Sequence, residues 1–140
     1  MTDDPHPSAA DLAVGDEGPE LVIEDVGRED FVKYAGASGD FNPIHYDEPY
    51  TREAGNESVF GQGMLTAGYA ATMVSDWFGV GNVTRFSVRF RARLWPGDTL
   101  SVTGKGTDIE PDGTVTAEVV VANGDDEPLV TGEVEADLPA

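Results

Sequence analysis

The residues with the clearest potential for chemistry lie in one short stretch, residues 38–45, which reads Ser-Gly-Asp-Phe-Asn-Pro-Ile-His. Asp40 and His45 are five residues apart, whereas partners on one helical turn fall three or four apart. Because a residue before proline is pushed out of the helical region, Asn42 favours a turn, and a folded loop can bring the two side chains together. Asp and His commonly activate water and move protons near neutral pH. His45 is the candidate catalytic imidazole, since the other histidine, His6, lies in an acidic, proline-containing leader.

A purely structural role explains the same stretch. Asp, Asn, Gly and Pro are the ordinary residues of turns. Asp40 would then cap the turn and His45 would fill space in the fold. The residues by themselves leave both interpretations open.

A second pattern with chemical potential is Gly-Gln-Gly-Met at residues 61–64, which precedes the longest helical pattern of the chain. Glycines there leave backbone N–H groups unobstructed at the helix end where the macrodipole is positive. Such groups polarise a carbonyl whose oxygen gains negative charge during a reaction. A tight connection has the same glycine pattern, so Gly63 is either a substrate-binding donor or a structural glycine.

The composition narrows the class of protein. A chain of 140 residues suits one domain with a single core. It contains no cysteine, which excludes disulfides, thiolate nucleophiles and sulfur-ligated zinc. The longest apolar stretch, near residues 64–80, is interrupted by Thr66, Thr72, Ser75 and Asp76, which argues against a membrane span. We expect a cytoplasmic protein that has no metal site.

The formal net charge is −19, from 27 acidic and 8 basic residues. Such a field repels nucleic-acid phosphates and anionic membranes, so neither is an expected partner. Apolar residues nevertheless recur in clean periodic patterns, which argues against disorder of the whole chain. We expect an acidic, solvated surface adapted to high salt, where screening over a few ångströms removes self-repulsion, and hence a halophilic source.

The first half of the chain predicts helices. Residues 1–19 are polar and contain three of the 9 prolines, so we expect an acidic, disordered tail before a single domain over residues 20–140. The apolar run at residues 20–23 suits a first strand or an extended lead-in. Helical spacing of apolar residues predicts helices over residues 25–37, 47–54 and 64–78. The last is apolar over most of its surface and is therefore expected to be buried on several sides.

The second half has a period of two. Phe86, Val88 and Phe90 alternate with arginines and serine, and the alternation resumes after each turn at Pro96-Gly97-Asp98, Pro111-Asp112-Gly113 and Asn123-Gly124. This pattern predicts a four-stranded antiparallel meander. A curved antiparallel sheet wrapped around one long buried helix satisfies both halves, which makes the expected fold class α+β.

Taken together, these residues resemble a known family. The strings Tyr34-Ala35-x-x-Ser38-Gly39-Asp40-x-Asn42-Pro43-Ile44-His45-x-Asp47 and Gly61-Gln62-Gly63-Met64 are similar to the MaoC-like (R)-specific enoyl-CoA hydratases. The motif resemblance runs from about residue 31 to about residue 70, and the order of elements agrees through the C-terminus. It implies the hotdog fold, a curved antiparallel sheet around a long central helix. The Gly-Asp-x-Asn-Pro-x-His string is its specific part.

The resemblance also implies a reaction. In the family the motif's aspartate and histidine bind the attacking water, and the aspartate helps to deprotonate it. The pair also delivers a proton to the α-carbon. Those roles fall on Asp40 and His45. Water adds to the β-carbon of a trans-2-enoyl thioester and gives an (R)-3-hydroxyacyl thioester. The Gly63 N–H matches the donor that meets the enolate-like thioester oxygen.

Supporting roles fall on the neighbouring residues of the motif. The resemblance implies that Asn42 holds the shape of the loop and that Ser38 and Gly39 shape its entry turn. Many relatives have histidine where this chain has Gln62. Since the Gly63 donor is a backbone group, this departure is expected to alter the pocket more than the mechanism.

The expected partner is an acyl-CoA substrate, with no separate cofactor. Four of the 8 basic residues, Arg85, Arg89, Arg91 and Arg93, share one face of an expected strand. Arginine forks suit the phosphates of coenzyme A, and the alternative is a solvent face or a subunit contact. Trp77 and Phe78 either line an acyl tunnel or belong to the core. By analogy with hotdog domains of this size we expect a homodimer or a dimer-based oligomer.

Two other functions remain open at this point. A hotdog thioesterase would hydrolyse the same thioesters and release free thiol. A non-catalytic acyl-CoA-binding protein would bind ligand without needing the Asp40 and His45 pair. The residues leave open the length and branching of the acyl chain and the choice between CoA and acyl carrier protein. They also leave open the pathway within fatty acid metabolism, whether fatty acid breakdown, polyhydroxyalkanoate supply or a special carbon-assimilation route.

Overall fold

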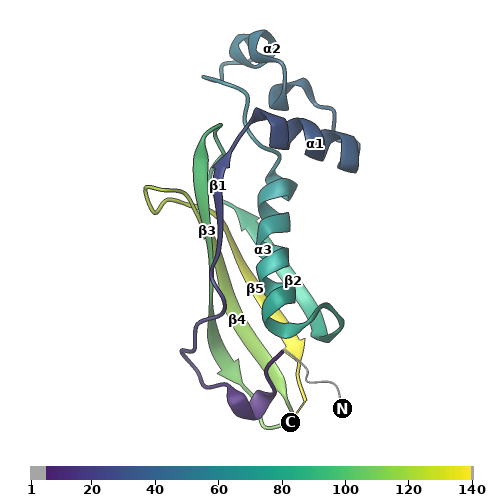
Figure 1. Ribbon diagram of the computed structural model, residues 1–140, viewed down its shortest axis with the longest axis vertical. Helices are drawn as coiled ribbons and strands as arrows, with labels where there is room; N and C mark the ends of the chain where they lie inside the picture. The colour runs from purple at the N-terminus through teal and green to yellow at the C-terminus, as the bar shows by residue number, and fades with distance from the viewer. Residues whose placement is uncertain (1–5, 140) are drawn as a thin grey trace.

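The structure, a computed structural model, describes residues 6–139. One antiparallel sheet, with strand order β1-β3-β4-β5-β2, curves around helix α3 (Figure 1). The strands are β1 (Leu21–Val26), β2 (Val83–Phe90), β3 (Asp98–Ile109), β4 (Thr114–Ala122) and β5 (Pro128–Asp137). The helices are α1 (Arg28–Ser38), α2 (Glu48–Glu53) and α3 (Gly63–Phe78), with short 3-10 turns η1 (Ala9–Asp11), η2 (Pro43–His45) and η3 (Val80–Asn82). The predicted α+β architecture is confirmed.

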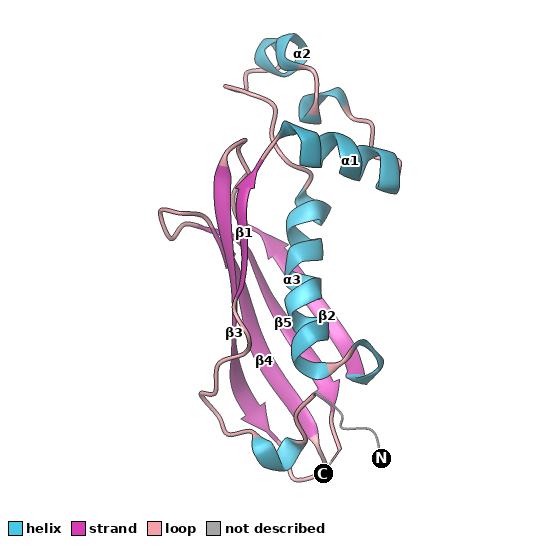
Figure 2. Cartoon of the chain, viewed as in Figure 1, coloured by secondary structure: helices cyan, strands magenta, loops and turns pink. Residues whose placement is uncertain are grey.

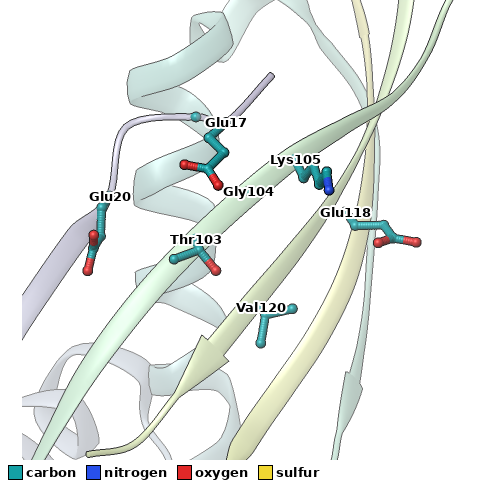
Figure 3. A pocket seen from close by; sticks show the side chains of 8 residues that line it. Glu17, Glu20, Thr103, Gly104, Lys105, Glu118 and Val120 are labelled. Atoms are coloured by element: carbon teal, nitrogen blue, oxygen red, sulfur yellow. The ribbon is translucent and has the colours of Figure 1, made fainter. Parts of the chain in front are cut away.

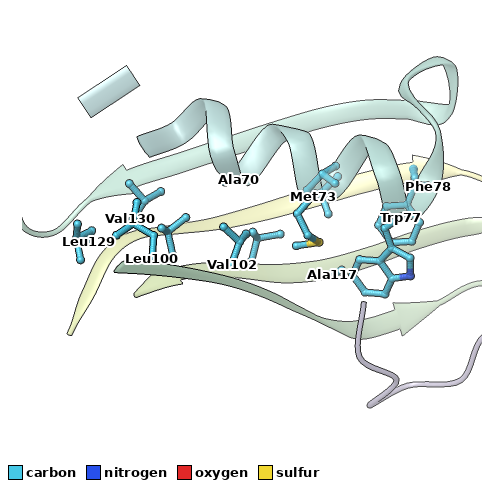
Figure 4. Packing of buried hydrophobic residues seen from close by; sticks show 14 of the residues in the cluster. Ala70, Met73, Trp77, Phe78, Leu100, Val102, Ala117, Leu129 and Val130 are labelled. Carbon is cyan, nitrogen blue, oxygen red and sulfur yellow. The ribbon is translucent and has the colours of Figure 1, made fainter. Parts of the chain in front are cut away.

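The core lies between α3 and the concave face of the sheet. Alternate residues of β4 are fully buried, whereas Glu118 between them is exposed, as the period of two predicts. Figure 4 shows Met73 and Trp77 of α3 pointing toward the apolar residues of the strands. Trp77 stacks on Phe78 with 4.2 Å between ring centroids, and both side chains belong to this core. No helix within residues 6–139 is both long and apolar enough to cross a bilayer.

The predicted meander is wrong in one respect, the position of β2. This strand pairs with β5, with Phe86 opposite Val134, and lies at the edge of the sheet. The strand next to it in the sequence, β3, pairs instead with β1 and β4. Residues 91–97 form a long connection rather than a tight hairpin turn, so the two strands need not be neighbours. Which strand β2 joins depends on non-local packing that a period of two does not contain.

Two predicted boundaries also differ from the structure. The first helix begins at Arg28 rather than at residue 25, because residues 25 and 26 continue β1. Val26 is buried in the core, and Gly27 stands at the helix N-cap. The strand expected to continue to Leu94 ends at Phe90. Beyond it the N–H groups of residues 91 and 92 both donate to the Leu129 carbonyl, which interrupts the regular ladder.

The expected disordered tail differs most from the structure. Residues 1–5 lie outside the described residues, but residues 6–19 lie against the sheet. The Gly15 and Gly18 N–H groups donate to the carbonyls of Gly106 and Gly104 at 2.8 and 2.9 Å. Ala9 is buried and its N–H donates to the Pro139 carbonyl at 2.7 Å. Backbone hydrogen bonds hold this polar segment against the sheet. The pattern of apolar residues therefore did not indicate that the segment is ordered.

Gly18 offers a test of this packing. A Cβ added at Gly18 would lie 2.6 Å from the Trp77 indole, whereas one at Gly36 in α1 would meet nothing within 4 Å. We expect Gly18→Ala to lower the free energy of unfolding by about 1–3 kcal/mol through overpacking. Gly36→Ala should leave stability unchanged or raise it by up to about 1 kcal/mol through helix propensity. Urea unfolding of both variants in high salt measures the difference. Equal stability of the two would mean that Gly18 does not pack on Trp77.

The two short helices position the motif loop. Figure 2 shows α1 and α2 beyond one end of the sheet, beside the N-terminal end of α3. The chain between α1 and α2, which carries residues 39–47, therefore lies at the same end as Gly63, the first residue of α3. Both patterns that suggested chemistry meet in this part of the fold.

Candidate active site

The entry turn of the motif loop is built from its own side chains. Gly39 ends α1 with φ of 80°, a left-handed conformation that glycine adopts without strain. The Ser38 hydroxyl donates to the Tyr34 carbonyl at 2.7 Å and accepts from the Asp40 N–H at 3.1 Å. The structure thus places Ser38 and Gly39 where they turn the chain out of the helix immediately before Asp40.

Asn42 begins the next element, the 3-10 turn η2. Its side-chain oxygen accepts from the Ile44 N–H at 3.3 Å, and Pro43 takes the first position of the turn. The Asn42 N–H in turn donates to Oδ1 of Asp40 at 3.3 Å. This bond uses one carboxylate oxygen of Asp40 for the loop and leaves Oδ2 free to face His45.

Asp40 and His45 come together at the centre of this loop. Nε2 of His45 lies 3.6 Å from Oδ2 of Asp40. The imidazole is 8% exposed, whereas the carboxylate is 45% exposed and open to solvent in the single chain. Nδ1 of His45 lies 2.7 Å from the Phe60 carbonyl oxygen. Because a carbonyl only accepts, Nδ1 carries the proton, and Nε2 of the neutral ring is an acceptor.

The resulting pair has an unusual chemical character. In the neutral-histidine form, two acceptors, Nε2 and Oδ2, face each other at 3.6 Å, beyond normal hydrogen-bonding distance. A molecule that donates two hydrogens satisfies both groups at once, and water is such a molecule. The arrangement suits holding one water molecule with its oxygen lone pairs directed away from the protein.

The N-terminus of α3 provides donors that complement these acceptors. The Leu65 and Thr66 N–H groups donate to the Gln62 carbonyl, whereas those of Gly63 and Met64 have no acceptor within residues 6–139. Free N–H groups at the start of a long helix favour a negatively charged oxygen. The Phe90 ring lies beside Gly63, 3.0 Å from where a Cβ would stand.

The connection between the dyad and α3 is short. Phe60 accepts from His45 through its carbonyl and donates its N–H to the Ile44 carbonyl at 3.3 Å. From Phe60 the chain reaches Gly63 within three residues, a span of at most about 10 Å. The structure therefore places Asp40, His45 and Gly63 at the same end of α3. The sequence alone placed them in two separate motifs.

Two residues with structural importance to the site were not predicted. Gln62 is buried, and its Nε2 donates to the Phe31 carbonyl of α1 at 2.8 Å, which fixes the start of α3 against α1. Its Oε1 is buried without a hydrogen-bond partner among the described residues. The only signal in the sequence was that Gln62 departs from the histidine of many relatives, which says nothing about its partner.

The second unpredicted residue is Glu48 in α2. Its Oε2 accepts from Arg28 at 2.9 Å and from the Val59 N–H at 3.3 Å, and its Oε1 pairs with Arg52 at 3.2 Å. The hydrogen bond from Arg28 lowers the pKa of the Glu48 carboxyl, with a smaller contribution from the Val59 N–H. Glu48 thus ties α1, α2 and the segment before Phe60 together. The spacing to Arg52 was visible in the sequence, but the two long-range partners were not.

The structure separates the four arginines that the sequence grouped. Arg85, Arg89 and Arg91 line a hollow of about 640 Å³, together with Glu118 and Glu133. Glu118 alternates with the core residues of β4, so this hollow lies on the outer face of the sheet. Arg93 lies elsewhere, with its guanidinium carbon 4.5 Å from the centre of the Phe60 ring.

A second hollow, of about 460 Å³, also lies away from the dyad. Figure 3 shows Glu17 and Glu20 of the N-terminal segment on one side of it, with Lys105 and Glu118 of the strands on the other. Neither hollow includes Asp40, His45 or Gly63. In residues 6–139 no group of three or more His, Cys, Asp or Glu side chains is arranged to hold a metal ion.

The fold and this loop define a hotdog domain with an Asp–His dyad at the N-terminus of its central helix. The MaoC like domain family matches residues 13–127, and the chain belongs to this family. An (R)-hydratase from Pseudomonas aeruginosa in its unliganded form superimposes with a TM-score of 0.83, at 26% identity over 94% of this chain and 85% of that one. The predicted resemblance and hotdog fold are confirmed.

Curated relatives match a shorter part of the chain. A peroxisomal multifunctional enzyme type 2 from Mus musculus is 34% identical over 94 residues, 65% of this chain and 13% of that protein. An (R)-specific enoyl-CoA hydratase from Rhodospirillum rubrum is 28% identical over 93 residues, 65% of each chain. The match thus spans less than two thirds of either relative.

Proposed function

We propose that this protein is an (R)-specific enoyl-CoA hydratase that also runs as a 3-hydroxyacyl-CoA dehydratase. The observation that carries the proposal is the pair of acceptors, Nε2 of His45 and Oδ2 of Asp40, 3.6 Å apart at the same end of the fold as the free N–H groups of α3. Such a site offers acceptors for water and donors for an oxyanion. The (R)-hydratase and (R)-specific enoyl-CoA hydratase among its relatives support this activity.

The proposed reaction follows from these groups. A water molecule donates one hydrogen to Asp40 and one to His45, and its oxygen bonds to the β-carbon of a trans-2-enoyl thioester. Asp40 takes the proton that water loses, and the π electrons move to the thioester oxygen, which the Gly63 N–H stabilises. The α-carbon then takes a proton from the dyad as the thioester carbonyl re-forms. Atoms and charge balance without a cofactor or metal, and the reverse sequence eliminates water.

We also propose that two copies of the chain form the working enzyme. The Asp40 carboxylate is half exposed, and Phe41, Met64 and Phe90 near the loop and the start of α3 are 60%, 59% and 54% exposed. Large apolar side chains beside an open reaction site favour a covering partner. The edge strand β2 has backbone groups available for pairing with a second copy. Sedimentation analysis should give twice the chain mass, and a monomer that is fully active would contradict this.

Hydration is tested by following two signals with trans-2-butenoyl-CoA in molar potassium chloride. A hydratase removes the conjugated enoyl absorbance and releases no thiol. A thioesterase releases thiol that a thiol reagent detects, and a binding protein changes neither signal at catalytic protein concentrations. We expect loss of the enoyl absorbance alone. Thiol release at the same rate as substrate loss would replace the hydratase proposal with the thioesterase.

The same assay tests the proposed adaptation to salt. With a net charge of −19 on 140 residues, the folded chain repels itself unless salt screens the charges. We propose that activity rises with potassium chloride concentration up to the molar range. Full folding and activity in salt-free buffer would contradict a halophilic source. A cytoplasmic location stays a prediction.

A further inference from the structure

We propose that Arg93 is a positioning residue that acts on His45 through Phe60. The inference rests on the proposed function for its kinetic consequence, but its structural part concerns the proton of His45 and is measurable without any reaction. Arg93 and Phe60 belong to neither motif, and the sequence placed Arg93 with three other arginines as a possible phosphate contact. The geometry assigns it a different place.

Phe60 is the residue that determines which nitrogen of His45 is free. Its carbonyl oxygen accepts from Nδ1 at 2.7 Å. Its ring meets the imidazole edge-on, with 5.3 Å between centroids and an interplanar angle of 81°. One residue therefore contacts His45 through both its backbone and its side chain. Phe60 lies in a segment outside the helices and strands, so its position depends on its backbone hydrogen bonds and on the contacts of its ring.

Two residues from one segment hold that ring. The Arg93 guanidinium lies over it at 4.5 Å from the centroid, and the Trp95 ring meets it at 6.0 Å with an interplanar angle of 68°. Between them, the Leu94 carbonyl accepts from the Gly61 N–H at 2.8 Å, which pairs the two segments next to Phe60. A guanidinium over a phenyl ring is an attractive cation–π contact.

The Arg93 side chain also contacts Asn56. Its guanidinium donates to the side-chain oxygen of Asn56, and it forms no ion pair with a carboxylate within residues 6–139. Its charge is thus available to the Phe60 ring. A single aromatic ring separates the Arg93 guanidinium from His45. In an acyl-CoA, by contrast, the whole pantetheine arm lies between the reacting thioester and the phosphates. This position favours a role in supporting the dyad over contact with the phosphates.

Loss of this support has a defined chemical consequence. If Phe60 moves, Nδ1 of His45 loses its acceptor, and free imidazole favours the tautomer with its proton on Nε2. Nε2 would then donate to Oδ2 of Asp40, which lies 3.6 Å away. Asp40 and His45 would then bond to each other, and the site would lose one of the two acceptors that hold water. The turnover step would slow, while binding of the thioester would change little.

Nitrogen NMR of the imidazole tests the structural part. The chain contains 2 histidines, so His6→Gln leaves one imidazole to observe. In that background we expect Nδ1 protonated and Nε2 unprotonated, and the variant Arg93→Met should show an increased share of the Nε2–H tautomer. Arg93→Lys keeps a cation over the ring and should restore the original tautomer. An unchanged tautomer in Arg93→Met overturns the proposal, whether or not the protein proves to be a hydratase.

Kinetics test its effect on the reaction, with Lys105→Met as the control, because it removes an exposed cation of β3 away from the dyad. We expect Arg93→Met to lower kcat about two- to five-fold, the scale of an exposed cation–π contact, with KM unchanged. The same fall should occur with trans-2-butenoyl-CoA and with trans-2-butenoyl-pantetheine, which has no phosphates. Lys105→Met should keep the wild-type kcat on both. A rise in KM confined to the CoA substrate would overturn the positioning role and make Arg93 a phosphate contact.

Discussion

Asp40→Asn should lower kcat/KM for hydration of trans-2-butenoyl-CoA by about 100-fold or more, the lower range for loss of general acid–base help. The asparagine amide keeps the size of the carboxylate but accepts no proton from water. Its NH2 group can also replace one of the two water acceptors with a donor facing Nε2 of His45, which lies 3.6 Å from Oδ2 in the native chain. Loss of the enoyl absorbance in molar potassium chloride measures the rate.

The matched control is Asp108→Asn, an exposed residue of β3 with the same change of charge. It should retain the wild-type rate, which separates loss of a catalytic group from loss of one negative charge. The kcat/KM of His45→Gln should fall by a factor similar to that of Asp40→Asn, whereas the kcat/KM of His6→Gln should not fall. Near wild-type turnover in Asp40→Asn and His45→Gln would place the reaction at another site.

Gly63→Pro should lower kcat by about 100-fold, because it removes the N–H that meets the enolate-like oxygen. Gly63 is the first residue of α3, a position where proline is well tolerated because this N–H has no helical partner. The residue before it, Gln62, has φ of −61° and ψ of 135°, which a following proline also permits. The substitution thus deletes a donor and keeps the helix.

Gly63→Ala is the control for the added side chain. A Cβ at this position lies 3.0 Å from the Phe90 ring in either variant, so alanine makes the Cβ contact of proline but keeps the N–H. We expect the kcat of Gly63→Ala to be several-fold higher than that of Gly63→Pro. The two variants should have equal helix content by circular dichroism. Equal activity of the two variants would show that the Gly63 N–H does not bind the thioester oxygen.

Local signals in the sequence predicted much of the site. Turn chemistry around Asn42-Pro43 favoured a loop that brings Asp40 and His45 together, and the structure places them 3.6 Å apart. The glycines before the apolar pattern of α3 marked the start of the helix within one residue. These features are encoded by residues close together in the chain, where turn propensity and helical periodicity act directly.

Long-range partners could not be predicted. The acceptor that fixes the tautomer of His45 is the backbone carbonyl of Phe60, which any residue type would supply. The pairing of β2 with β5 and of the N-terminal segment with β3 depends on backbone hydrogen bonds between distant parts of the chain. The alternation of Arg85, Arg89, Arg91 and Arg93 suggested one face, but the strand ends at Phe90, and Arg93 turns toward Phe60 instead.

In the proposed reaction one dyad both holds the water and supplies the α-proton, and hydration in D2O is a direct test of this shared role. Asp40 and His45 lie side by side, so both additions should come from the same face of the substrate. With trans-2-butenoyl-CoA we expect a single (R)-3-hydroxy product whose α-deuterium and β-oxygen were added to one face, seen in the proton coupling between the two carbons. Addition to opposite faces would require an acid on the far side of the substrate, and would mean that Asp40 and His45 do not perform both steps.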